Sequence, residues 1–206
     1  MDNIRAVIFD LGRVLIDFDY LSGVKRISRF CDKTPQEITS LFFNSPLTNS
    51  FEEGKISPGI FFKEVKTVLG LRIGFKEFLP IWNEIFYMTE ENKKTFHLAG
   101  DLKNNYKLAL LSNVNILHLD YIKKEFPVFD IFDPILASCE LGLIKPDYRI
   151  YQQAINALEC QPAEIFYTDD REELIDAAKK FGLRGFVYKG FEQLKYDLIS
   201  CGVKSN

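Results

Sequence analysis

The chain has 206 residues, of which 47% are hydrophobic, and its 26 Lys and Arg residues nearly balance 29 Asp and Glu residues, for a net charge of −3. This length and composition are typical of a folded protein with one large domain, or one core plus a modest insertion. The slightly acidic balance argues against a nucleic-acid partner, which normally requires a clustered basic surface, and the longest apolar runs, such as Leu108–Leu111, are too short to span a membrane.

The first predicted element is a strand near the N-terminus. Ala6–Phe9 is a continuous apolar run that ends at Asp10. A run that is apolar on both faces is typical of a buried strand in a parallel sheet.

The segment that follows, residues 17–91, contains no convincing buried strand and is predicted to be helical. Proline follows Thr34 and Ser57, which is typical of a helix start, and Gly70 is typical of a helix end. The predicted helices are Leu21–Phe30, Gln36–Phe43, Gly59–Leu69 and Phe75–Tyr87.

From residue 92 onward, apolar strand-like runs alternate with amphipathic helices. The runs are Leu108–Leu111, Ile135–Ala137, Ile165–Tyr167 and Gly185–Tyr188. Helical faces are formed by Leu117, Tyr121, Ile122 and Phe126, by Ile150, Ala154, Ile155 and Leu158, and by Leu174, Ala177, Ala178 and Phe181, with Gly182 ending the last helix.

This alternation predicts an α/β fold, a Rossmann-like parallel sheet with helices on both faces. Residues 1–16 and 92–206 would form this core, and residues 17–91 would form an inserted helical cap. Ligands of open parallel sheets bind at the carboxyl ends of the strands. A segment inserted after the first strand would therefore cover the ligand site.

Polar side chains follow four of the predicted strands, at that same edge. They are Asp10, Ser112 with Asn113, Lys145, and Asp169 with Asp170. Three carboxylates at one edge would repel one another, and both a cation and Lys145 would relieve the repulsion. Oxygen ligands suit Mg²⁺, which neutralises and orients a phosphoryl group, and an aspartate can be the nucleophile that accepts that group. The pattern predicts metal-assisted phosphoryl transfer.

The four motifs also resemble those of the haloacid dehalogenase-like hydrolases, in the subgroup with a helical cap after the first strand. The matching segments are Val-Ile-Phe-Asp-Leu-Gly around Asp10, Leu-Leu-Ser-Asn around Ser112, Gly-Leu-Ile-Lys-Pro around Lys145 and Tyr-Thr-Asp-Asp around Asp169 and Asp170. Within the family, the chain is most similar to bacterial members that act on sugar phosphates such as glucose 1-phosphate.

The resemblance implies a role for each motif residue. Asp10 would be the nucleophile and a magnesium ligand, and Gly12 would offer its backbone carbonyl to the metal. Ser112 and Asn113 would bind the phosphoryl group, and Lys145 would balance charge. The metal site would be completed by Asp170, with Asp169 as a second acidic contact.

Two positions depart from the commonest phosphatase pattern of this family. Most members have an aspartate, the general acid and base, where this chain has Gly12, although the glucose 1-phosphate-type relatives also have glycine. Leu174 stands where Asp or Asn often holds a metal-bound water. Glu173 is not expected to replace it, because adjacent helical residues point about 100° apart. Leu174 is expected to pack into the core.

Three further residues, Arg13, His97 and His118, have no role assigned by these motifs. Arg13 could bind a substrate phosphate or carboxylate through its guanidinium group, or it could pair with Asp17 or Asp19. His97 and His118 fall on helical patterns without metal-ligand spacing, so both are expected to be ordinary surface or interface residues.

The leading hypothesis is an Mg²⁺-dependent phosphatase of a small phosphorylated metabolite, and a sugar phosphate is the expected substrate. A metal-free 2-haloacid dehalogenase is compatible with Gly12, but it has no use for the extra carboxylates Asp169 and Asp170. A binding or regulatory protein with little turnover is the third reading, and the retained buried charges weigh against it.

The N-terminus and the cysteines suggest the cellular compartment. The first residues lead directly into a strand-like run, without the basic start and long apolar stretch of a signal peptide, so a cytoplasmic protein is expected. No CxxC pair occurs, and free thiols are expected at Cys31, Cys139, Cys160 and Cys201.

Overall fold

The computed structural model describes residues 3–43 and 45–204 and contains the predicted parallel sheet. Five strands lie in the order β5-β4-β1-β6-β7, and every neighbouring pair is parallel. The strands are β1 (Ala6–Phe9), β4 (Lys107–Ser112), β5 (Ile135–Ala137), β6 (Ile165–Asp169) and β7 (Arg184–Val187). The central position of β1 explains why its sequence is apolar on both faces.

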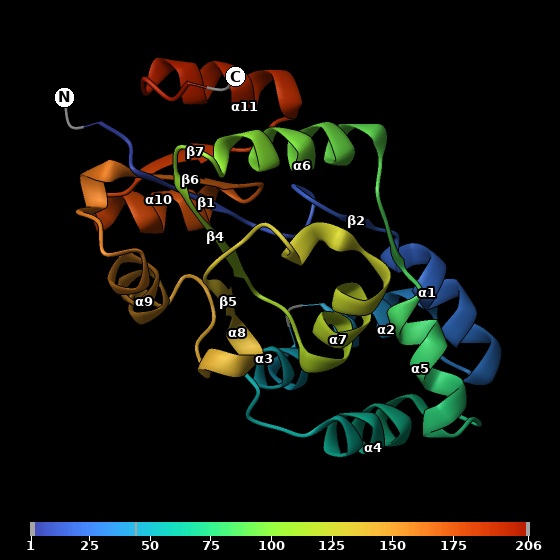
Figure 1. Cartoon of the computed structure of the whole chain (residues 1–206). Coiled ribbons are helices and arrows are strands. Elements are labelled where there is room, and N and C mark those ends of the chain that lie inside the picture. Colours follow the sequence, from blue (N-terminus) through green and yellow to red (C-terminus); the bar gives the residue numbers. More distant parts are fainter. Residues whose placement is uncertain (1–2, 44, 205–206) are drawn as a thin grey trace.

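Helices cover both faces of this sheet (Figure 1). Val7 and Phe9 face a core shared with α6 (Glu90–Leu102), α7 (Ile116–Glu125) and α11 (Phe191–Ser200). Ala6 and Ile8 face the opposite core, which is shared with α9 (Tyr148–Leu158) and α10 (Glu172–Lys180). The short α8 (Ser138–Leu141) follows β5 directly. The α/β fold predicted from the sequence is therefore confirmed.

The segment between β1 and α6 forms a group of helices with a hydrophobic cluster of its own. Its helices are α1 (Tyr20–Ile27), α2 (Pro35–Phe42), α3 (Pro46–Glu52), α4 (Pro58–Leu69) and α5 (Phe75–Asn83). Several aromatic rings pack within this cluster, and the Phe51 and Phe61 rings stack with centroids 4.2 Å apart. We call α1–α5 the helical insert.

The boundaries of the insert helices follow from local capping. The Thr34 side chain accepts a hydrogen bond from the backbone of Glu37 at the start of α2, and Ser57 similarly caps α4. Gly70 ends α4 with a φ of 64°, which only glycine adopts without strain. The predicted starts at Thr34 and Ser57 and the predicted stop at Gly70 are confirmed.

Three features of the insert differ from the sequence interpretation. The helix α3 was not predicted, because its seven residues lack a helical apolar repeat. The predicted helix Phe75–Tyr87 ends at Asn83, and its last residues join β3 (Phe86–Tyr87), which pairs antiparallel with β2 (Asp17–Phe18). This two-stranded ribbon joins the insert to the rest of the chain.

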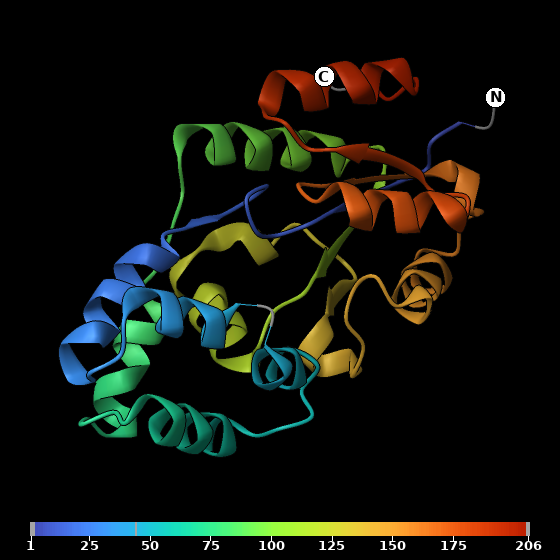
Figure 2. The same ribbon diagram turned by 180° about the vertical axis from the view of Figure 1, so that it is seen from behind.

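Seen from both sides, the insert lies beyond the end of the sheet where α7 and α8 lie, and α3 packs beside α8 (Figures 1 and 2). No helix of the described residues is both long enough and apolar enough to cross a membrane. All four cysteines are free thiols, as expected.

Candidate active site

The carboxyl ends of β1 and β6 bring three carboxylates together. Asp10 follows β1 directly, and its backbone N–H donates a hydrogen bond of 3.0 Å to the Thr168 carbonyl of β6. Asp169 is the last residue of β6, and Asp170 follows it. One ligand oxygen from each of these three aspartates lies within 4.8 Å of the other two. The residues predicted to hold a metal therefore converge.

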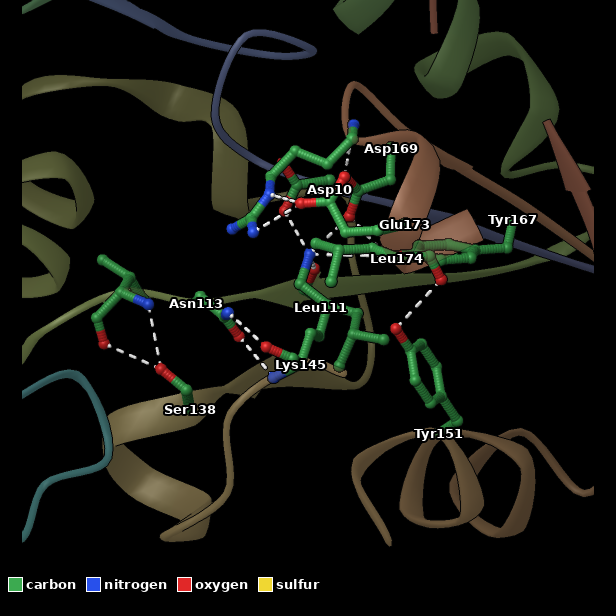
Figure 3. Close-up of polar contacts among 12 residues, drawn as sticks. Asp10, Leu111, Asn113, Ser138, Lys145, Tyr151, Tyr167, Asp169, Glu173 and Leu174 are labelled. Atoms are coloured by element: carbon green, nitrogen blue, oxygen red, sulfur yellow. Dashed lines mark hydrogen bonds and ion pairs between the residues drawn. The ribbon is translucent and has the colours of Figure 1, made fainter. Parts of the chain in front are cut away.

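Lys145 lies between two of these carboxylates (Figure 3). Its Nζ is 2.7 Å from Asp10 Oδ1 and 2.7 Å from Asp169 Oδ2, and it also donates to the Leu111 carbonyl at 2.9 Å. Only 3% of Lys145 is exposed. Because the buried ammonium bonds to two carboxylates that would otherwise repel each other, it holds them close together.

Asn113 positions the loop that carries this lysine. Its side-chain amide donates to the Lys145 carbonyl at 3.0 Å, and its Oδ1 accepts from the Lys145 N–H at 2.8 Å. The predicted phosphoryl-binding role of Asn113 stays a prediction, and the visible role of its amide is to fix the backbone of Lys145. Ser112, the last residue of β4, is buried at the same edge of the sheet.

The charge states of the cluster follow from burial and pairing. Burial raises the pKa of Asp10 to about 7, although the Lys145 charge opposes the shift. Burial also acts on Asp169, but Lys145 and the hydroxyl of Tyr167 outweigh it and lower the pKa of Asp169. Burial raises the pKa of Asp170. The raised pKa values of Asp10 and Asp170 show that Lys145 alone does not offset the cost of burying three ionised carboxylates side by side.

This donor set fits a magnesium ion. The three aspartates offer only oxygen ligands, and an additional cation would favour their ionised forms. The Gly12 backbone also borders the cavity, close to Asp10: a Cβ at Gly12 would lie 3.9 Å from Asp10 Oδ2. The residues therefore fit the cofactor predicted from the sequence.

Arg13 forms one of the two contacts considered from the sequence. Its guanidinium group pairs with Asp17 and stacks on the Phe18 ring, with 4.2 Å between the guanidinium carbon and the ring centroid. The backbone of Arg13 has a φ of 60°, in the left-handed region. Arg13 also lines the cavity, so its predicted contact with substrate stays a prediction.

Leu174, the second departure from the family pattern, packs into the core as expected. Leu174 is 1% exposed, and its carbonyl accepts a hydrogen bond from the Tyr151 hydroxyl. Glu173 pairs instead with Arg171 at 2.6 Å, and 60% of its side chain is exposed. Glu173 therefore does not replace the missing ligand.

The cluster opens into a cavity of about 500 Å³ between the sheet edge and the helical insert. Its floor contains Asp10, Ser112, Lys145, Asp169 and Asp170. The insert contributes a polar patch and a larger apolar wall. The polar patch is Thr48, Asn49 and Glu52, and the apolar wall is Val24, Ile27, Phe42, Ile81, Trp82 and Ile85.

The end of α3 is fixed against α8 by its backbone. The Ser138 hydroxyl donates a hydrogen bond of 2.6 Å to the Glu52 carbonyl and accepts one from the Val114 N–H at 2.9 Å. At Gly54, a Cβ would lie 2.2 Å from the Cys139 carbonyl oxygen, and φ is +68°. Only glycine fits this approach. The sequence interpretation assigned no role to Glu52, because its helix has no apolar repeat that would show which way the side chain faces.

His118 joins α7 to the insert. Its ring stacks on Trp82 with 4.7 Å between centroids, Nε2 bonds to the Trp82 carbonyl at 3.1 Å, and Nδ1 bonds to the Asn115 amide at 3.0 Å. Burial lowers the pKa of His118 to about 4. It is thus a neutral interface residue. Asn115 caps α7 by accepting from the His118 N–H.

Known proteins are similar to this chain in sequence. Residues 4–182 match the model of the haloacid dehalogenase-like hydrolase family. A D-ribitol-5-phosphate phosphatase from Bacteroides thetaiotaomicron is 25% identical over 189 residues, which cover 89% of this chain and 91% of that protein. A sesquiterpene phosphatase from Aspergillus oryzae is 23% identical over 182 residues, which cover 88% of each chain.

The fold also resembles that of a solved structure. A haloacid dehalogenase family enzyme from Bacteroides thetaiotaomicron, in complex with magnesium and inorganic phosphate, is 26% identical to this chain with a TM-score of 0.80. The match covers 91% of this chain and 95% of that one.

Proposed function

This chain belongs to the haloacid dehalogenase-like hydrolases, and we propose that it is an Mg²⁺-dependent phosphatase of a small phosphorylated metabolite. The observation that carries the proposal is the pairing of Lys145 with both Asp10 and Asp169, beside the third carboxylate of Asp170. The phosphatases among its relatives and the magnesium and phosphate bound to a similar enzyme support it.

The proposed residue roles follow from this geometry. Asp10 is the nucleophile, because it lies on the cavity floor and Lys145 stabilises its ionised form. Ser112 lies at the adjacent strand end, where its hydroxyl can donate to a phosphoryl oxygen. The metal would be held by Asp10, Asp169, Asp170 and the Gly12 carbonyl, and it would neutralise charge on the phosphoryl group. Asn113 keeps Lys145 in place.

The helical insert acts in this proposal as a cap, with residues 17–91 forming the cap domain and residues 1–16 and 92–206 the catalytic core. Its helices have their own hydrophobic cluster and supply the wall of the cavity that faces the sheet edge. A cap excludes water from the reacting groups and recognises the part of the substrate beyond the phosphate.

For the substrate, we propose a sugar phosphate. The phosphatase from Bacteroides thetaiotaomicron acts on a sugar-alcohol phosphate, and the polar patch of Thr48, Asn49 and Glu52 offers partners for hydroxyl groups. The apolar wall makes a prenyl phosphate the most informative comparison substrate. Cytoplasmic location stays a prediction from the sequence.

The test is hydrolysis of sugar, prenyl and aryl phosphates with Mg²⁺ or with a chelator. Asp10→Asn is the inactive variant, and Asp176→Asn, at an exposed position of α10, is its matched control. Turnover that requires both the metal and Asp10 supports the proposal. Release of halide from a 2-haloacid without metal, with no phosphate released from any ester, would replace it with dehalogenation.

A further inference from the structure

A phosphatase must also protonate the oxygen that leaves the phosphorus, and the described residues beside Asp10 do not offer an obvious donor. Gly12 has no side chain to carry a proton. An alkoxide is a poor leaving group, and a positioned acid typically accelerates such a step by about 10²–10⁴-fold. If the proposed function holds, the proton has to come from elsewhere in the cavity.

Most titratable groups that line the cavity are already engaged. His118 bonds through both ring nitrogens, to Trp82 and Asn115. Arg13 pairs with Asp17. The Lys145 ammonium is shared by Asp10 and Asp169, and these carboxylates raise its pKa despite burial.

Glu52 differs from these groups in position and in environment. It is the last residue of α3, and its side chain lines the cavity that also contains Asp10 and Lys145. Its backbone is anchored, because the Glu52 carbonyl accepts a hydrogen bond of 2.6 Å from the Ser138 hydroxyl. Two residues later, the backbone at Gly54 packs against Cys139. The docked end of α3 thus holds Glu52 in the wall of the cavity that contains the nucleophile.

The charges that act on Glu52 are Arg171, in the loop after β6, and Lys145. Both favour the ionised carboxylate, but burial outweighs them and raises the pKa of Glu52 to about 7. A carboxyl group with such a pKa can both give and take a proton near neutral pH, which is what an acid–base catalyst requires.

We propose that Glu52 is the general acid and base of the reaction, in place of the side chain that Gly12 lacks. When the Asp10 carboxylate attacks phosphorus, an oxygen–phosphorus bond forms, the bond to the leaving oxygen breaks, and that oxygen takes the Glu52 proton. Water then attacks the phosphorus of the aspartyl phosphate and gives one proton to the Glu52 carboxylate. The bond to Asp10 breaks, inorganic phosphate leaves, and both side chains return to their starting states.

The test compares Glu52→Gln with wild type on an alkyl phosphate and on p-nitrophenyl phosphate, whose leaving group needs little protonation. We expect kcat/KM to fall at least about 100-fold on the alkyl ester and less than about fivefold on the aryl ester. Glu53→Gln is the matched control, since Glu53 is adjacent in sequence but pairs with Lys55 at 2.7 Å and does not line the cavity. It should behave as wild type on both esters.

An equal loss on both esters, or no loss on the alkyl ester, would overturn the assignment of Glu52. The kcat/KM on the aryl ester reports the steps up to formation of the aspartyl phosphate, in which the leaving group needs little protonation. Glu52→Gln protein that retains this kcat/KM is therefore shown to be folded. Wild-type protein that hydrolyses neither ester with Mg²⁺ would instead overturn the proposed phosphatase function, so the two failures are distinguishable.

Discussion

Lys145 Nζ lies 2.7 Å from Asp10 Oδ1 in an environment where neither residue is more than 7% exposed. Asn113 fixes the backbone of this lysine through two hydrogen bonds, although Lys145 lies in a loop. Buried charges are costly unless paired. The ion pair therefore links the stability of the fold to the chemistry of the site.

Replacing this lysine by methionine should destabilise the protein and abolish turnover. Lys145→Met leaves Asp10 and Asp169 buried without their counter-charge, which typically costs about 3–5 kcal/mol. The loss of stability should become smaller as the pH falls, because protonation relieves the repulsion between the two carboxylates. Urea unfolding at pH 7 and pH 5 measures it. Lys123→Met, which removes a surface pair with Glu140, should change stability by less than about 1 kcal/mol at either pH.

Magnesium should stabilise the folded chain, and the effect should depend on Asp170. At a concentration 100 times its dissociation constant, a ligand of the native state adds about 2.7 kcal/mol to stability, which corresponds to a rise in Tm of about 5–10 °C for a chain of this size. Asp170→Asn should lose most of this rise in thermal unfolding with Mg²⁺ against chelator.

Glu173→Gln is the control for Asp170→Asn. Glu173 carries the same charge three residues later, but it pairs with Arg171 and its side chain is largely exposed. It should keep the full response to Mg²⁺. A wild-type Tm that is the same with Mg²⁺ and with chelator would contradict the proposed metal site.

His118 should make stability fall in acid. Burial lowers its pKa from 6.5 to about 4, so the unfolded chain binds its proton more readily than the folded chain does. The contribution of this pKa shift to the free energy of unfolding is complete above pH 6.5 and is lost progressively as the pH falls toward 4. His118→Phe retains a ring beside Trp82 but cannot be protonated. Between pH 6.5 and 4 its free energy of unfolding should fall less steeply than that of wild type.

At pH 7 the same variant should be less stable by about 1 kcal/mol, because the bond to the Trp82 carbonyl is lost. His97→Phe, on α6, is the comparison and should retain the acid slope of wild type. Parallel pH profiles for His118→Phe and wild type would show that His118 does not titrate in this way.

The sequence predicted the sheet and the polar edge better than the insert. Ala6–Phe9 and Ile135–Ala137 have the same bounds as β1 and β5, because buried strands in a parallel sheet are apolar on both faces. The convergence of Asp10, Lys145 and Asp169 followed from the shared edge of parallel strands. The sequence contains no comparable signal for contacts that depend on how separate helices pack.

Glu52 and His118 illustrate that limit. Glu52 lies in a seven-residue helix, and its environment is created by Ser138 and Arg171, which are distant in sequence. His118 has the helical spacing of a surface residue, and only the position of Trp82 against α7 buries it. Pairings between elements are set by tertiary packing, which hydrophobic periodicity alone does not encode.

The close contact at Gly54 allows the docking of α3 to be tested separately from backbone strain. Gly54→Ala places a Cβ 2.2 Å from the Cys139 carbonyl oxygen at a φ of +68°, whereas Gly70→Ala has a similar φ of +64° and nothing within 4 Å. Both variants should lose about 1 kcal/mol from the left-handed backbone. Gly54→Ala should lose about 1–3 kcal/mol more from the clash and, because α3 must shift, most of its turnover of alkyl phosphates. Chemical unfolding and kinetics measure both effects, and equal losses in the two variants would show that the α3–α8 contact does not hold the cavity together.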